Sequence, residues 1–352
     1  MLCVSLFSGC GGLDIGLEKA GFDIVLANDN DRYCQESYLA NRSIAFHLGS
    51  VSELSKEVLA NYLQDKVDRI DLLAGGPPCP PYSKSRFYRK DMPRGLDDPT
   101  GWETMSGYFD VLSVLKPWAF LLENVPGLLY KAHKESFDYV LDRAAKLGYT
   151  CTYKVVNAAN YGVPQMRERL ILVGVREGKF MFPKEPYANP EKGTLGASKQ
   201  KWKTAGEAIS DLDTEENASD KGHFAGGKHH ELLKQVPPGD NYLFFTEKRG
   251  YPNPKFKWRS RYWSFLLKLS PDKPSWTIQA RRSNNMGPLH WRNRILRIEE
   301  IKRLQTFPDD WILSGTIERQ WRQIGNAVPP LLAEKIGEAI YQHLLKESRC
   351  SG

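Results

Sequence analysis

A single cysteine held between prolines at the end of an apolar strand constrains this chain more than any other feature. Residues 71–86 read DLLAGGPPCPPYSKSR, so an apolar run enters two glycines and then Cys79, with two prolines on either side. A strand, a tight turn and a thiol at the strand's carboxyl end are how an α/β fold presents a nucleophile. A lone cysteine is more often a buried structural residue. The prolines favour a fixed presenting loop, because they stiffen the turn and remove backbone donors.

Length and composition are those of a globular protein with an ample core. The chain has 352 residues, enough for one large or two smaller domains. Its six cysteines are scattered, none forms a C-x-x-C pair, and no histidine lies at ligand spacing from them. We therefore expect neither a zinc site nor a disulfide framework. No run approaches the ~18 apolar residues of a membrane span and no basic leader is present, so we expect a cytoplasmic protein with no membrane partner.

Strands and helices alternate along the first half of the chain, which is typical of a doubly wound parallel sheet. We expect strands at residues 2–7, 23–27, 45–48, 69–74, 118–122, 149–157 and 170–175. We expect helices at residues 13–20, 32–40, 105–115, 136–147 and 331–345. Apolar residues at steps of four support the last helix. Residues 83–102 show no apolar period and are predicted to form a long mobile loop.

The amino-acid composition and the periodicity of the chain change near residue 183. Residues 183–320 are rich in proline, glycine, lysine and aromatic residues and show weak periodicity, which predicts a separate, loop-rich domain. Residues 321–352 return to an α/β pattern. The predicted organisation is thus an α/β domain at 1–182, a smaller domain at 183–320, and a C-terminal segment at 321–352 that completes the first domain.

The loop after the first strand suits a ligand smaller than a dinucleotide. Residues 7–16 read FSGCGGLDIG, in which the third glycine of the dinucleotide fingerprint is replaced by Asp14. The second strand ends at Asp29 and Asp31, where an acid is placed to hold a pair of ribose hydroxyls. A helix N-cap is the alternative use of such an acid. Either residue could serve in either role.

Basic and aromatic residues are concentrated in one part of a chain whose net charge is only +7. Residues 248–303 hold fifteen Lys or Arg against three acids, a net charge of +12. Aromatic residues are interleaved with these charges, among them Trp258, Tyr262, Trp263, Trp276 and Trp291. Such a segment indicates a nucleic-acid surface. A solvated basic face is the alternative.

Five stretches follow one another in a fixed order: FSGCGGLDIG from residue 7, GGPPCPPYS from 75, ENVPG from 123, QMRERL from 165 and QIGNAVPP from 323. Together they closely resemble the motifs of the cytosine-C5 DNA methyltransferases of bacteria and phages. The resemblance covers residues 1–182 and 292–345 well. It implies a class I S-adenosylmethionine-dependent methyltransferase, with a Rossmann-like, doubly wound, mostly parallel sheet. Residues 1–182 would be the catalytic and cofactor-binding domain, and 183–320 the target-recognition domain.

The resemblance implies a covalent mechanism in which Cys79 adds to C6 of cytosine, so that C5 can attack the methyl donor. Glu123 would hold a proton at cytosine N3, which requires a raised carboxyl pKa. Arg167 would contact the O2 side of the base and support the charge of the adduct. Arg169 would brace Glu123 or the thiol loop, and Asn124 would orient the neighbouring loop. Loss of the C5 proton to water and expulsion of Cys79 would release the product.

The implied methyl donor is S-adenosylmethionine, with S-adenosylhomocysteine as the product. Phe7 would stack on the adenine, and Asp29 would take the ribose hydroxyls. The backbone at the glycine loop would meet the methionine part, and two residues before the last helix would close the pocket. The full predicted set is Phe7, Gly9, Cys10, Gly11, Gly12, Asp29, Asn30, Ser50, Val51, Pro78, Asn326 and Val328.

The implied macromolecular substrate is double-stranded DNA, whose target base must be flipped out of the stack. The basic loop after Cys79, with Ser83, Lys84 and Arg86, would close over the base from one groove. The basic segment would read the sequence from the other groove, with Arg as the usual partner of guanine. Candidate base or phosphate contacts are Arg259, Arg261, Arg281 and Arg282. We expect a monomer without a bound metal, paired with a separate restriction endonuclease.

Two residues depart from the family pattern. Ser50 follows the third strand where many members carry an acid for the adenine amino group. Pro80 follows Cys79 where many members carry Gln beside the flipping path. The alternatives to a DNA methyltransferase are the tRNA-modifying branch of the same fold and an inactive DNA-binding relative. The first usually shows a Cys-Phe-Thr element that is absent here, and the second would be expected to lose Cys79 or Glu123.

Overall fold

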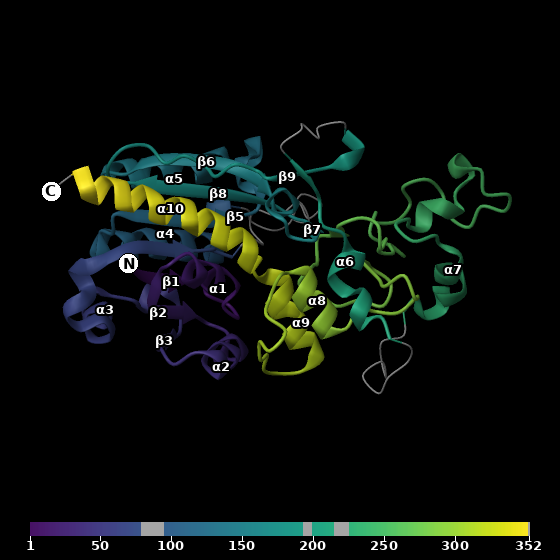
Figure 1. Cartoon of the computed structure of the whole chain (residues 1–352), viewed down its shortest axis with the longest axis horizontal. Helices are drawn as coiled ribbons and strands as arrows, with labels where there is room; N and C mark the ends of the chain where they lie inside the picture. Colours follow the sequence, from purple (N-terminus) through teal and green to yellow (C-terminus); the bar gives the residue numbers. More distant parts are fainter. Residues whose placement is uncertain (79–94, 193–198, 215–224, 351–352) are drawn as a thin grey trace.

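The computed structural model describes residues 1–78, 95–192, 199–214 and 225–350. Its centre is a seven-stranded sheet in the order β3-β2-β1-β4-β5-β8-β6 (Figure 1). Every neighbouring pair is parallel except those made by β8, which runs antiparallel to both β5 and β6. The strands are β1 (Leu2–Leu6), β2 (Asp23–Asp29), β3 (Ala45–Leu48), β4 (Ile70–Gly75), β5 (Ala119–Asn124), β6 (Thr150–Asn157) and β8 (Glu168–Val175). The predicted doubly wound, mostly parallel sheet is confirmed.

Helices cover both faces of this sheet. One apolar cluster joins its strands to α3 (Lys56–Leu63), α4 (Pro99–Leu115) and α5 (Lys134–Lys146). The opposite cluster joins them to α1 (Gly12–Lys19) and α10 (Pro330–Cys350). A further helix, α2 (Arg32–Asn41), contacts β2 and β3. The chain's last helix therefore packs beside its first, which puts the C-terminal segment in the core of the sheet domain.

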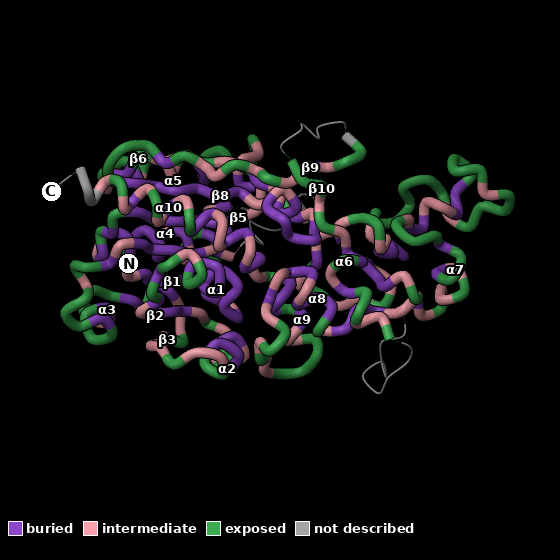
Figure 2. Tube along the Cα trace, viewed as in Figure 1, coloured by how far each residue is buried: buried purple, intermediate pink, exposed green. Residues whose placement is uncertain are grey.

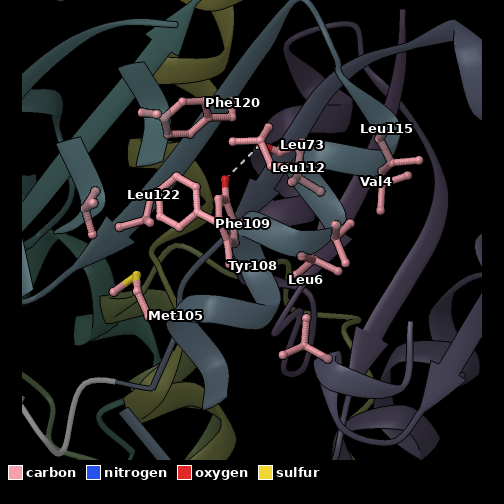
Figure 3. Close-up of a cluster of buried hydrophobic side chains, with 14 of the residues drawn as sticks. Val4, Leu6, Leu73, Met105, Tyr108, Phe109, Leu112, Leu115, Phe120 and Leu122 are labelled. Carbon is pink, nitrogen blue, oxygen red and sulfur yellow. Dashed lines mark hydrogen bonds between the residues drawn. The ribbon is translucent and has the colours of Figure 1, made fainter. Parts of the chain in front are cut away.

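Helix α4 packs its apolar face on the middle of the sheet, and one buried tyrosine of that face also hydrogen-bonds two strands (Figure 3). The hydroxyl of Tyr108 donates to the carbonyls of Leu73 in β4 (3.2 Å) and Leu121 in β5 (3.0 Å). The helix begins at Pro99, earlier than the predicted residue 105. The side chain of Asp98 caps it, and a proline in the first turn suits a helix start. The prediction missed this first turn because it carries no apolar period.

Two glycines of α1 allow it to approach α10 closely. A Cβ built on Gly12 would lie 2.5 Å from the carbonyl oxygen of Val328. A Cβ built on Gly16 would lie 2.3 Å from the carbonyl oxygen of Pro330 and 2.4 Å from Cβ of Ala333. These distances are far inside van der Waals contact, so only glycine fits there.

The remaining described part forms a smaller, loop-rich body, whose apolar cluster also takes in Cys10 and Ile15 of the sheet domain. It contains the two-residue strands β9 (Tyr187–Ala188), β10 (Gln200–Lys201) and β11 (Ser275–Trp276), and the helices α6 (Ala205–Ile209), α7 (His230–Gln235), α8 (Ile298–Leu304) and α9 (Ile317–Asn326). Strand β11 pairs with β7 (Gln165–Met166), which joins this body to the sheet domain. Buried residues concentrate along the sheet, whereas the loops farthest from it are largely exposed (Figure 2). The predicted domain boundaries stay predictions.

Replacing Gly16 by Ala tests the close packing of α1 on α10. Helix propensity alone would stabilise the protein by about 1 kcal/mol. We expect instead a loss of about 1–3 kcal/mol, because the new methyl group must push backbone atoms apart. The free energy of unfolding in urea measures this, with the exposed Lys19→Ala on the same helix as a control. A Gly16→Ala variant as stable as the parent would contradict the packing.

Candidate active site

The carboxyl ends of the neighbouring strands β4 and β5 meet where the predicted nucleophile loop begins. The strands are parallel, with Gly75 paired to Leu122. A Cβ built on Gly76 would lie 2.9 Å from Oε2 of Glu123. The side-chain amide of Asn124 donates to the carbonyl of Pro77 at 3.2 Å. The last two residues of β5 thus hold the loop that leads to Cys79, which itself lies outside the described residues.

The carboxylate of Glu123 forms a buried ion pair with Arg169. Oε1 of Glu123 lies 2.6 Å from Nε of Arg169, and the two side chains are only 11% and 13% exposed. Burial raises the pKa of the Glu123 carboxyl, and the positive charges of Arg169 and then Arg167 oppose that rise without cancelling it. The carboxyl therefore keeps a proton above the ordinary range of a glutamic acid, as a proton donor to a ring nitrogen requires. That role stays a prediction.

Arg167 does not occupy the position predicted for it. Its side chain is fully buried. One terminal nitrogen donates to the carbonyl of Ile278 (3.0 Å), and the other donates to those of Gly325 (2.8 Å) and Ala327 (3.0 Å). A guanidinium engaged by three backbone carbonyls cannot turn toward a substrate base, so the predicted contact with the O2 side of cytosine is corrected. The arginine that faces Glu123 is Arg169.

Two glutamines extend the junction that Arg167 forms. The amide nitrogen of Gln165 donates to the carbonyl of Leu304 (3.2 Å) and to the side chain of Gln305 (3.0 Å), and its oxygen accepts from the amide of Ile278 (3.0 Å). Gln305 in turn donates to the carbonyl of Ile324 at 2.6 Å. All these partners lie more than a hundred residues after β7 in the sequence. No local sequence pattern could therefore have predicted the junction.

The glycine loop and the end of β2, both predicted to bind the cofactor, lie next to each other, and their cofactor role stays a prediction. Oδ2 of Asp29 accepts from the amide of Gly9 (2.9 Å), and Oδ1 accepts from the amide of Asp31 (2.9 Å). The side chain of Asp31 caps α2 by accepting from Tyr33. The N-cap role, which the sequence left open, therefore belongs to Asp31. Phe7, half-buried at the end of β1, has a φ of +55°.

The other residues predicted at the cofactor differ in their surroundings. Cys10 is fully buried, and burial raises the pKa of its thiol to about 12. The amide of Gly11 already donates to the carbonyl of Ser8 (2.9 Å), and Gly12 packs on Val328. Asn30 and Asn326 are exposed, Val51 and Val328 are buried, and Pro78 is half-buried.

Ser50 is tied to a carboxylate from another element. Its hydroxyl donates to Oε1 of Glu103 on α4 at 2.5 Å, and the hydroxyl of Ser52 donates to the same oxygen at 3.0 Å. Ser50 also caps the short 3-10 helix Val51–Glu53. Many family members carry an acid after the third strand, where this chain has Ser50. Here Glu103 of α4 brings a carboxylate next to that position. Glu103 could not be found from the sequence because it lies 53 residues away.

The residues predicted to contact DNA differ in solvent exposure. Arg259, Arg261 and Arg281 are exposed. Arg282 is half-buried and pairs with Glu318 at 3.4 Å, so it is less available than predicted. The other three, Ser83, Lys84 and Arg86, lie outside the described residues, as does Pro80.

An open cavity of about 930 Å³ lies between the two parts of the molecule. The loop after β5 lines one side with Val125 and Tyr130, and Met166 of β7 lies beside it. The smaller body contributes the tryptophans Trp202 and Trp276. The cavity is thus a cleft with aromatic walls, next to the end of the strand that carries Glu123.

Comparisons with known proteins match these features. Residues 1–342 match the family model described as C-5 cytosine-specific DNA methylase. The chain belongs to this family. It is 36% identical to the Type II methyltransferase M.SacI of Streptomyces achromogenes, over 97% of this chain and 93% of that protein. It is 32% identical to the Type II methyltransferase M.MthTI of Methanothermobacter thermautotrophicus, over 97% of both.

Solved structures share the fold of this methylase. A putative DNA modification methyltransferase encoded within an E. coli prophage aligns over 98% of this chain and 99% of its own, with a TM-score of 0.69 and 22% identity. The S. pombe Dnmt2 methyltransferase aligns over 99% of both chains, with a TM-score of 0.61 and 17% identity. At these identities the likeness concerns the fold alone.

The same substitution at Arg167 and at Arg169 tests whether the two arginines of this methylase differ in their contribution to stability. Arg167→Met should cost at least about 3 kcal/mol of stability, because it leaves buried carbonyls without donors. Arg169→Met should cost less, because the Glu123 carboxyl can take up a proton. Urea unfolding of both variants measures the difference. Equal losses, or an Arg167→Met variant that unfolds like the parent, would contradict the buried junction.

Proposed function

We propose that this methylase transfers a methyl group from S-adenosylmethionine to C5 of a cytosine within a specific sequence of double-stranded DNA. The family to which the chain belongs supports cytosine C5 as the acceptor. The single observation that carries the proposal is the buried Glu123 carboxyl. Its raised pKa, its ion pair with Arg169 and its place next to Gly76, where a Cβ would clash with it, suit a proton donor beside the nucleophile loop.

Each residue has a separate role in the proposed methyl transfer. The thiolate of Cys79 bonds to C6 of the flipped cytosine. The Glu123 carboxyl donates its proton toward N3, which draws charge out of the ring as that bond forms. Arg169 fixes the orientation of the carboxyl and compensates its charge once the proton has moved. Asn124 holds the loop before Cys79 through the carbonyl of Pro77. After methylation, water takes the C5 proton, the C5=C6 double bond re-forms as Cys79 leaves as a thiolate, and N3 returns its proton to Glu123.

The glycine loop fits the proposed methyl donor. A Cβ built on Gly9 meets no atom within 4 Å, so the space beside this residue is open, whereas Gly11 and Gly12 are packed against protein atoms. Asp29 lies next to that space, and its carboxylate, which accepts from the backbone amides of Gly9 and Asp31, keeps acceptor capacity for a hydroxyl group. Phe7 offers a half-buried ring. When bound there, S-adenosylmethionine supplies an electrophilic methyl group.

Duplex DNA is the proposed partner, and the cleft between the two parts of the molecule is its proposed location. The basic segment from residue 248 supplies the charge, and flipping brings the base to Glu123. The relatives' names place them in Type II systems, and we propose the same restriction-modification role here, with a separate endonuclease. No described helix is long and apolar enough to cross a membrane. We propose that the enzyme acts as a monomer in the cytoplasm.

Trapping with a fluorinated base tests the covalent step. In duplex DNA carrying 5-fluorocytosine in place of cytosine, fluorine at C5 cannot leave as a proton, so the bond between Cys79 and C6 should persist. We expect an enzyme–DNA adduct on a denaturing gel when the methyl donor is present. Cys79→Ser should form none while it still binds DNA. No adduct with the parent enzyme, or an equal adduct with Cys79→Ser, would contradict attack at C6.

The pH dependence of single-turnover methylation tests the role of Glu123. If the protonated carboxyl assists, the rate falls as the pH rises through its raised pKa and the proton is lost. Glu123→Gln cannot lose a proton in this way. It should be slower by about 10²–10⁴-fold and should lack that fall. The exposed Glu135→Gln is the control and should behave like the parent. A Glu123→Gln variant that keeps both the rate and the fall would rule out this role.

A further inference from the structure

A continuous exposed loop follows α7, the helix farthest from the sheet in Figure 1. Of residues 252–263, all are exposed except the half-buried Phe256. The loop carries four cations, Lys255, Lys257, Arg259 and Arg261, and no Asp or Glu occurs between residues 248 and 271. Within the described part of the chain, none of these four side chains has an ion-pair partner. Their charges are therefore available to an anionic partner.

The tip of this loop is a tight turn with a strained residue. The amide and the hydroxyl of Ser260 both donate to the carbonyl of Lys257, at 3.2 and 2.7 Å. Trp258 and Arg259 are the two central residues of the turn. Arg259 has a φ of +55°, a left-handed conformation that glycine or asparagine adopts more readily than arginine. A turn with this geometry would be more stable with glycine at residue 259.

The base of the loop is rigid. Phe256 packs at its start in a cluster of rings with Tyr242 and Phe265. The hydroxyl of Tyr242 donates to the carbonyl of Arg261 (2.8 Å) and accepts from its amide (3.2 Å). At the tip, the ammonium of Lys248 lies 4.5 Å from the ring centre of Trp258. The turn is thus presented on a fixed support, which lowers the entropy lost when a partner binds.

Backbone strain of this kind clusters at ligand-binding and active sites, so the strain at Arg259, together with the available charges around it, points to a binding role. We propose that the turn at residues 257–260 enters the major groove of the target DNA and that Arg259 reads one guanine there, through its O6 and N7 atoms. Arginine presents two parallel donors to these two acceptors, which no other base offers together. Lys255, just before the turn, and Lys257, its first residue, contact phosphates and carry no sequence information. This proposal rests on the function proposed above and adds the residue that selects the sequence.

The test is to measure site preference and stability in the same variant. Arg259→Gly removes the side chain and relieves the backbone strain. We expect its melting temperature to equal or exceed that of the parent. We expect its preference for guanine at one position of the site to fall by about 10- to 100-fold, as loss of a bidentate contact implies. Methylation of a duplex library with randomised positions, followed by bisulfite sequencing, measures the preference.

Two control variants sharpen this test. Lys116 in the sheet domain is also exposed, with a φ of +45°, so Lys116→Gly removes the same strain and one charge at a distance from the loop. It should raise the melting temperature without changing site preference. Lys255→Ala should weaken DNA binding equally for all sequences and lower the slope of log affinity against log salt by about one.

The outcomes separate this proposal from the underlying function. If the parent methylates no cytosine, or methylates without sequence preference, the proposed function fails. If the parent is specific and Arg259→Gly keeps every position of the preference, the base-reading role of Arg259 fails alone. A uniform loss of affinity in Arg259→Gly, with the preference intact, would make Arg259 a phosphate contact and would also overturn the proposal.

Discussion

The structure depends on one buried guanidinium. Arg167 is fully buried and donates to carbonyls from two separate stretches, Ile278 in the smaller body and Gly325 and Ala327 before the last helix. A buried charge is tolerated only when its donors are satisfied. The three segments must therefore stay together for the protein to be stable. Because one of them leads out of the smaller body and another enters α10, this contact sets how that body is held against the sheet.

The same short stretch of chain serves the junction and the proposed chemistry. Gln165, Arg167 and Arg169 occupy every second position of one extended segment. The first two point into the junction, and the third pairs with Glu123. Burial raises the pKa of the Glu123 carboxyl, and the charge of Arg167 opposes part of that rise, although less than the charge of Arg169 does. The support of the cleft and the electrostatics of the active site are thus physically linked.

Most of the sheet domain could be predicted from the sequence, because apolar periodicity and glycine loops are local signals. The strands and the helix of residues 331–345 follow from them. What could not be predicted depends on distant partners. Arg167 and Arg169 look equivalent in an extended segment, and only the carbonyls at 278, 325 and 327 distinguish them. The pairing of Ser50 with Glu103 and the strain at Arg259 likewise have no local sequence signature.

Bisulfite sequencing of DNA from cells that express this methylase tests the central claim most directly. It reports the modified base, its position on the ring and its sequence context together. The account predicts one short sequence in which the same cytosine is protected at nearly every occurrence, and no protection in cells that express Cys79→Ser. DNA without protected cytosines, or protection that persists with Cys79→Ser, would contradict it.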